Sequence, residues 1–99
     1  MLTSKQRAYL RSLAVNEDTI LILGKSGSSA EVVKQADDAL TARELIKGRV
    51  LESSPINSRE AAECLAEATG ADVVQVIGSR FVLYRRREKD PVIVLPRAR

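Results

Sequence analysis

A short loop of small residues with one lysine, Gly24-Lys25-Ser26-Gly27, joins the apolar run at residues 19–23 to a polar segment. Glycines three positions apart permit a tight turn and let another molecule approach the backbone closely. If a helix begins after this loop, its free N–H groups and its dipole favour an anion there, and Lys25 adds a mobile positive charge. The chemical group that this arrangement suits best is a phosphate.

Known phosphate-binding loops differ in how well they match this spacing. The nucleoside-triphosphate loop requires G-x-x-x-x-G-K-[ST], and its spacing is not present here. The dinucleotide fingerprint G-x-G-x-x-G lacks its first glycine in this chain. The remaining pattern is the G-x-x-G with which KH domains clamp a nucleotide backbone. A G-x-x-G between a strand and a helix is also compatible with a purely structural turn, so the interpretation depends on the charges around it.

Positive charge is unevenly distributed along the chain, although the formal net charge is only +3. Residues 1–11 contain three cations and no acid, residues 80–89 contain five cations and one acid, and residues 52–72 are mainly acidic. We therefore expect a basic side and an acidic side. Arg7 and Arg11 lie one helical turn apart, which weakens an isolated helix by about 0.2–0.5 kcal/mol and favours a role in binding over simple exposure. The cations expected at the binding surface are Lys5, Arg7, Arg11, Lys47, Arg49 and Arg80.

The composition disfavours catalytic and metal chemistry. The sequence has no histidine and a single cysteine, so it lacks the commonest general base, the commonest metal ligand and any internal disulfide. We expect Cys64 to be a small buried residue in a reducing compartment. The adjacent carboxylates Asp37 and Asp38 would diverge on a helix, and Asp38 is placed to pair with Lys34. We therefore expect no catalytic residue, no metal site and no cofactor.

Length and hydropathy indicate one domain in an aqueous environment. The chain has 99 residues, of which 44% are hydrophobic, enough for one modest core. It shows no secretory signal pattern and no apolar run near the roughly 18 residues that a membrane span needs. We expect a soluble, cytoplasmic protein with no membrane partner.

Capping patterns and hydrophobic periodicity predict three helices. Residues 3–14 form the first helix. Ser28 and Glu31 have the spacing of a capping box and are expected to open the second. Asn57 and Glu60 repeat that spacing and open the third. The buried stripe expected for the third helix is Ala61, Cys64, Leu65 and Ala68.

Four strands complete the expected fold. They are residues 19–23, 44–51, 72–77 and 80–85. The first should be buried, and Gly78-Ser79 suits a type II′ turn between the last two. Residues 90–96 can add a short edge strand. Because a strand-helix-strand unit favours a parallel pair and a hairpin is antiparallel, we expect an α/β fold, α+β-like and two-layered. Its order is α-β-α-β-α-β-β, with a mixed four-stranded sheet.

Five stretches resemble the CRM domain in their order and spacing, in particular its bacterial stand-alone, YhbY-like form. They are "LTSKQRAYLRSLA", "ILGKSGSSAEVVKQADDAL", "ELIKGRVL", "SREAAECLAEATGADVVQVIG" and "FVLYR". The resemblance implies one RNA-binding domain at residues 1–96, followed by a short tail at 97–99. It also implies a fold similar to the C-terminal domain of bacterial translation initiation factor three, and an association with precursors of the large ribosomal subunit.

The same resemblance bears on individual residues. The loop corresponds to the G-x-x-G signature of the family, so Gly24, Lys25 and Gly27 carry over directly, while Ser26 is smaller than the polar residue of many relatives. The likeness supports the basic residues of the first helix less specifically. It assigns nothing after Glu88, and the arginine run at residues 85–87 fits RNA contact as well as a solvated tail.

The leading hypothesis is an RNA-binding protein that assists ribosome assembly without catalysis. It would bind precursor large-subunit ribosomal RNA in pre-50S particles, as a monomer, with Lys25 and the loop N–H groups facing a phosphate. Phe81 and Tyr84 should lie on opposite faces of their strand, which argues against base stacking of the RRM type. The alternative is a protein–protein adaptor that docks a ribosomal protein or an assembly enzyme through a sheet edge or an acidic helix. The acids of that helix are Glu60, Glu63 and Glu67.

Overall fold

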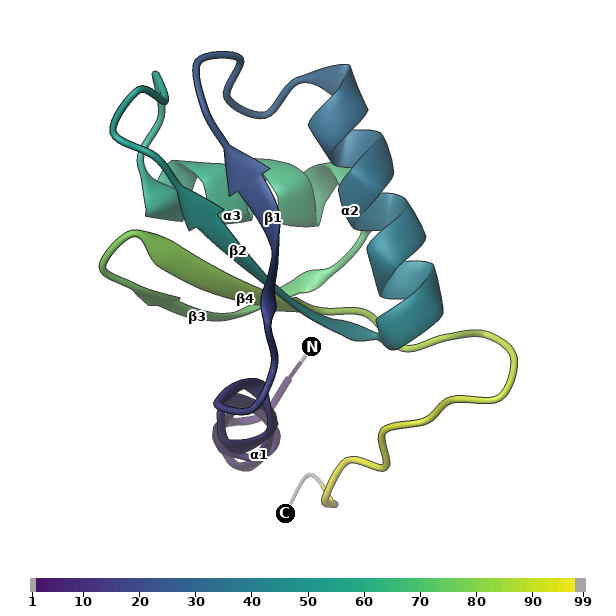
Figure 1. The fold of residues 1–99 in the computed structure, drawn as a ribbon. Helices are drawn as coiled ribbons and strands as arrows, with labels where there is room; N and C mark the ends of the chain where they lie inside the picture. The colour runs from purple at the N-terminus through teal and green to yellow at the C-terminus, as the bar shows by residue number, and fades with distance from the viewer. Residues whose placement is uncertain (1, 98–99) are drawn as a thin grey trace.

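A computed structural model describes residues 2–97 and contains seven regular elements (Figure 1). The order α-β-α-β-α-β-β expected from the sequence is confirmed. The elements are α1 (Ser4–Ala14), β1 (Thr19–Leu23), α2 (Ala30–Arg43), β2 (Leu45–Val50), α3 (Ser58–Thr69), β3 (Asp72–Ile77) and β4 (Arg80–Tyr84). None of the helices within residues 2–97 is long and apolar enough to cross a membrane.

The four strands form one mixed sheet in the order β1-β2-β4-β3. β1 and β2 are parallel, as the intervening α2 requires, and β4 pairs antiparallel with both β2 and β3. Gly78 has a φ of 57° at the first position of the β3–β4 turn, as a type II′ turn requires. The expected mixed four-stranded sheet is therefore confirmed.

Helices cover both faces of this sheet. α2 and α3 pack on one face, where the core includes Leu21, Ile46, Phe81 and Leu83. α1 packs on the other face, with Leu10 of the helix against a second cluster of sheet residues. That cluster includes Leu45, Val74, Val82 and Tyr84. The fold thus adds a helix on the face that a two-layer arrangement leaves open (Figure 1).

The two aromatic residues of β4 are buried on opposite faces, as expected. Phe81 is 0% exposed and belongs to the core under α2 and α3, whereas Tyr84 is 3% exposed and belongs to the core under α1. The Phe81 ring fills the space over Gly48 so closely that a Cβ at Gly48 would overlap it. Neither aromatic ring is available to stack on a base.

Local caps set the helix starts, with one correction. Thr3 with Gln6 and Asn57 with Glu60 form complete capping boxes. The N-cap of α2 is Ser29 rather than Ser28, because Ser29 has an extended backbone and its hydroxyl accepts the N–H of Val32 at 3.3 Å. The prediction for Ser28 is therefore wrong by one residue.

The burial expected for α3 and β1 also needs correction. α3 buries Ala61, Ala62, Leu65 and Ala66. Cys64 and Ala68, which were expected in the core, are exposed because the helix packs with its inner stripe turned toward Ala62 and Ala66. β1 is an edge strand, and its Ile22 is 57% exposed instead of buried.

Residues 90–96 form no strand, contrary to the sequence expectation. Their backbone is held by side chains from other elements, since the Glu44 carboxylate accepts the N–H groups of Val92 and Ile93, both at 2.7 Å. Gln6 of α1 donates to the Pro96 carbonyl at 3.1 Å. This C-terminal segment therefore runs back towards α1 instead of extending the sheet (Figure 1).

Glu44 connects α2, β2 and the C-terminal segment. It is fully buried, has a φ of 67°, and also accepts the N–H of Arg87 at 2.9 Å. Burial disfavours its charge, but the three backbone donors and the nearby charge of Arg87 outweigh burial, so the pKa of Glu44 lies below its ordinary value. The carboxylate is thus a buried, charged anchor for the end of the chain.

Candidate nucleic-acid interface

The loop at residues 24–27 is a tight turn whose glycines face inward. The N–H of Gly27 donates to the Gly24 carbonyl at 3.0 Å. Gly27 has a φ of +58°, and a Cβ there would lie 3.2 Å from Cγ of Pro55. Gly27 is buried and Gly24 half-buried, while Lys25 and Ser26 are exposed. The glycines therefore shape the turn, and the two residues between them are presented to solvent.

The start of α2 adds little net positive charge beside the loop. The Ser29 hydroxyl already caps the N–H of Val32. Glu31 is exposed in the first turn, where its carboxylate complements the helix dipole. Lys25 is therefore the main exposed positive charge of this loop.

Four of the six predicted flanking cations lie on the sheet face opposite α2 and α3. Lys47 and Arg49 alternate along β2 with Ile46, Gly48 and Val50, and so project away from the Phe81 core. Arg49 is the cross-strand partner of Arg80. Arg11, at the C-terminal part of α1, lines a shallow depression of about 110 Å³ with Lys47 and Arg80.

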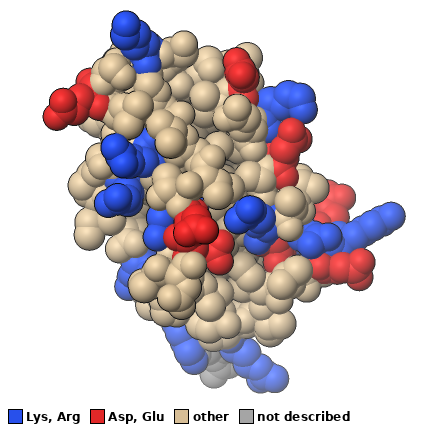
Figure 2. All heavy atoms as spheres, viewed as in Figure 1, with Lys and Arg blue, Asp and Glu red and all other residues tan. Residues whose placement is uncertain are grey.

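Two of these cations, Arg49 and Arg80, lie at the end of the sheet that carries the loop, whereas Lys47 pairs with Thr19 at the start of β1, farther from the loop. β1 ends at Leu23, next to Gly24, and Leu23 pairs with Val50 at the end of β2. The N–H of Val50 donates to the Ser79 carbonyl at 2.7 Å, which brings the β3–β4 turn to the same end. In the view of Figure 2, Lys and Arg side chains extend from the top of the molecule, where the loop lies, down its left side, with an acidic group at the upper left, and both signs also mix on the right.

Lys5 and Arg7 are not part of this group. They lie in the first half of α1, near Gln6, which contacts the C-terminal segment at Pro96. The Arg7 guanidinium is half-buried and makes a long contact of 3.4 Å to the carbonyl of Val73 in β3. The structure therefore divides the predicted cations into four that lie together on this sheet face and two at the other end of α1.

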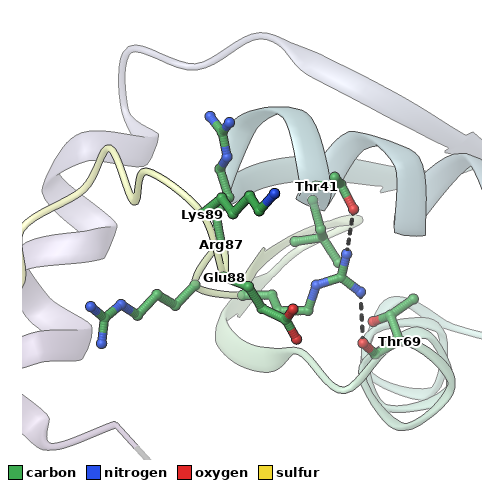
Figure 3. A pocket seen from close by; sticks show the side chains of 8 residues that line it. Thr41, Thr69, Arg87, Glu88 and Lys89 are labelled. Atoms are coloured by element: carbon green, nitrogen blue, oxygen red, sulfur yellow. Dashed lines mark hydrogen bonds between the residues drawn. The ribbon is translucent and has the colours of Figure 1, made fainter.

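Arg85, the first residue of the arginine run at 85–87, makes hydrogen bonds that hold elements of the fold together. The Arg85 guanidinium donates to the Thr69 carbonyl at 2.8 Å and to the Thr41 hydroxyl at 2.8 Å (Figure 3). It also donates to the Asp37 carboxylate at 2.6 Å. Arg85 thus ties the C-terminal ends of α2 and α3 beside a pocket of about 600 Å³. No sequence pattern indicates this role, because the partners of Arg85 are 16 to 48 residues away.

The acidic face of α3 is partly engaged within its own helix. Glu60 accepts the Asn57 N–H in the capping box at 3.0 Å, and Glu63 lies 3.9 Å from Arg59. On α2, the expected pair of Lys34 and Asp38 is confirmed at 3.0 Å. These local contacts of Glu60 and Glu63 on α3 weaken the hypothesis that this helix docks a partner protein.

Comparison with known proteins adds relatives over almost the whole chain. A sequence model described as the CRS1 / YhbY (CRM) domain matches residues 2–85. The chain is 40% identical to "Probable RNA-binding protein YqeI" of Bacillus subtilis, over 97% of this chain and 100% of that protein. It is 33% identical to an "RNA-binding protein" of Haemophilus influenzae, over 97% and 96% of the two chains.

A solved structure agrees with these matches. The solution structure of the hypothetical protein SAV1595 from Staphylococcus aureus, presented as a candidate RNA-binding protein, superposes with a TM-score of 0.81 at 50% identity. The superposition covers 97% of this chain and 100% of that one. Because the family model, the relatives and the solved structure all match nearly the whole chain, the chain belongs to the CRS1/YhbY (CRM) domain family.

Proposed function

We propose that this chain binds RNA through the exposed part of its G-x-x-G loop and the four cations grouped on the adjoining sheet face. Lys25 and Ser26 would contact one phosphate, and the neighbouring cations would contact the backbone on either side. Gly24 and Gly27 would hold the turn that presents them. The cations of this surface are Arg11, Lys47, Arg49 and Arg80.

The observation that carries this proposal is that these cations are close together and uncompensated. The ion pairs formed within residues 2–97 involve Lys34, Arg59 and Arg85, and none involves a member of this surface. Facing arginines on adjacent strands repel one another, which is destabilising unless an anion lies between them. A phosphate backbone supplies such anions at regular intervals. The names of the relatives, which describe RNA-binding proteins, support the same ligand.

The proposed target is precursor large-subunit ribosomal RNA in pre-50S particles, as the resemblance to CRM domains implies. The chain would act as a single domain over residues 1–96, as a monomer and without catalysis. Lys5 and Arg7 would make at most outlying contacts, because they lie at the far end of α1. Two of the three acids of α3 have partners within their own helix, Glu60 at the cap and Glu63 beside Arg59, which favours RNA binding over docking through this helix.

The salt dependence of RNA affinity tests the charged surface. Five phosphate contacts predict that log affinity falls against log salt with a slope of about −3.5 for single strands and −4.5 for duplexes. Neutralising Lys25, Arg49 and Arg80 together should make the slope less steep by about 2 for single strands and about 2.7 for duplexes. The matched control neutralises Lys34, Arg43 and Arg59 on α2 and α3, and it should leave the slope unchanged. Equal slopes for the two triple variants would contradict the proposal.

The ribosomal target has a separate test in cells. Crosslinking followed by sequencing of the attached RNA should enrich precursor large-subunit RNA, and Lys25→Asp should remove most of that signal. Enrichment of messenger RNA, or an unchanged pattern with the variant, would contradict the assembly role. It would not contradict RNA binding, which the salt dependence tests separately.

A further inference from the structure

One residue from each strand forms an exposed line across the sheet, here called the open row: Ile22, Arg49, Arg80 and Ile77. The register pairs Ile22 with Arg49, Arg49 with Arg80, and Arg80 with Ile77. Paired residues project on the same side of a sheet. The open row thus places two guanidinium groups in the middle and an aliphatic side chain at each end.

The open row is left uncovered by α1. That helix packs over Leu45, Val74 and Tyr84, towards the other end of the same face. Ile22 is 57% exposed and Ile77 63% exposed. Val15, directly after α1, is 77% exposed and lines the depression that also contains Ile77 and Arg80. Three of the six exposed large apolar side chains of residues 2–97 therefore surround the basic surface, instead of being scattered.

This composition indicates more than a phosphate contact. An RNA duplex presents phosphates and hydroxyl groups to a protein, so cations alone would suffice and the isoleucines would gain nothing. Unpaired bases can stack on guanidinium planes and pack against apolar side chains. Adjacent strands are about 4.8 Å apart, so the open row spans about 14 Å. A four-stranded sheet of this width accommodates two or three bases in RRM domains.

We propose that the open row binds two or three unpaired bases of an RNA strand whose backbone is held at Lys25. Ile22 lies two residues before Gly24, so the row begins at the foot of the loop. The proposal rests on the proposed RNA-binding function and narrows its ligand class to single-stranded or looped RNA. Arginine and isoleucine take the place that aromatic residues have in an RRM, because Phe81 and Tyr84 are buried.

The test compares two probes that differ only in pairing: a labelled 12-nucleotide RNA without self-complementarity, and the same strand annealed to its complement. Wild type should bind the single strand more tightly than the duplex. The double variant Ile22→Ser/Ile77→Ser should weaken single-strand binding about five- to tenfold, since it removes apolar contact, and leave duplex binding and the salt slope unchanged. Val94→Ser is the matched control, because Val94 is 81% exposed and lies in the C-terminal segment.

A second variant separates stacking from charge. Arg49→Lys/Arg80→Lys keeps both positive charges but loses the planar groups, so single-strand affinity should fall while the salt slope stays the same. If the serine and lysine variants bind the single strand as wild type does, the open row is not a base site, and a protein partner becomes its explanation. If wild type binds neither probe at low salt, the proposed RNA-binding function itself is wrong. Thermal unfolding of each variant checks that it is folded.

Discussion

The hydroxyl of Ser28 lies 2.9 Å from the sulfur of Cys64, so the only cysteine of the chain contacts the first residue after the G-x-x-G loop. Cys64 is exposed on α3. A native thiol therefore reports on the occupancy of the loop without any engineered label.

RNA bound at the loop should slow the reaction of Cys64 with a soluble thiol reagent. The phosphate held at Lys25 would lie close to Ser28, and the end of the strand that leaves the loop on the α3 side would obstruct the approach to the sulfur. At saturating RNA we expect the rate of modification, followed by mass spectrometry, to fall several-fold. With Lys25→Asp, the same RNA concentration should give little protection. An unchanged rate on fully bound wild-type protein would place the RNA elsewhere.

Substitution of the two loop glycines should have unequal effects on stability. Gly27→Ala places a side chain at a φ of +58° and 3.2 Å from Pro55, and we expect it to lower the free energy of unfolding by about 1–2 kcal/mol. In Gly24→Ala the new Cβ would lie 3.6 Å from Ser53 Oγ, an ordinary contact, so the loss should be below about 0.5 kcal/mol. Urea denaturation measures both values. Equal losses would contradict the inward-facing role assigned to Gly27.

Removing the charge of Glu44 should release the C-terminal segment. In Glu44→Gln, one amide nitrogen replaces an oxygen that accepts backbone N–H groups, so we expect a loss of about 2–4 kcal/mol in the free energy of unfolding. Amide hydrogen exchange should accelerate at Val92 and Ile93, whose N–H groups the carboxylate accepts. Glu67→Gln, an exposed substitution on α3, is the control. Unchanged exchange rates would mean that other contacts hold the segment.

Glu44 also predicts a pH dependence of stability. Because its pKa is lower in the folded state, the folded state binds fewer protons than the unfolded state near that pKa. The stabilisation is therefore fully present above the ordinary glutamate pKa and is lost as the pH falls through the lowered value. The free energy of unfolding should decline with acidification more steeply in wild type than in Glu44→Gln. Parallel curves between about pH 5 and pH 2 would contradict the assignment.

Alanine substitution at Arg85 should lower stability without changing RNA binding, and substitution at Arg86 should leave stability nearly unchanged. Arg85→Ala leaves the Thr69 carbonyl and the Asp37 carboxylate without their donor, and we expect a loss of about 1.5–3 kcal/mol in stability with the salt slope of RNA binding unchanged. Arg86→Ala, at an exposed position, should change stability by less than about 0.5 kcal/mol. Chemical denaturation combined with the RNA titration distinguishes the two effects. A large change in salt slope for Arg85→Ala would assign its guanidinium to RNA instead.

Features that depend on residues within one turn of each other could be predicted from the sequence. The capping box of Asn57 and Glu60 closes over three residues, and α3 ends at Gly70, whose φ of 76° is the left-handed conformation that glycine favours after a helix. Lys47 and Arg49 lie on the face of β2 opposite Ile46 because successive side chains of a strand alternate, which is also a local rule. These local rules were sufficient for the element order and for the loop at residues 24–27.

Features that depend on distant partners could not be predicted. The exposure of Cys64 follows from the side on which α3 meets the sheet and α2, and periodicity alone does not specify that side. The C-terminal segment failed to form a strand because a buried carboxylate more than 40 residues away accepts its N–H groups.

The sequence by itself determined the elements, the turn between the two loop glycines and the number of available cations. Only the tertiary structure decided which cations share a surface, because the pairing of β2 with β4 brings Arg49 beside Arg80 while the packing of α1 leaves Lys5 and Arg7 at its far end. The physical reason is the range of the interactions: caps and turns are satisfied by neighbours in the chain, whereas strand register and helix packing are set by apolar burial between segments that no local pattern connects.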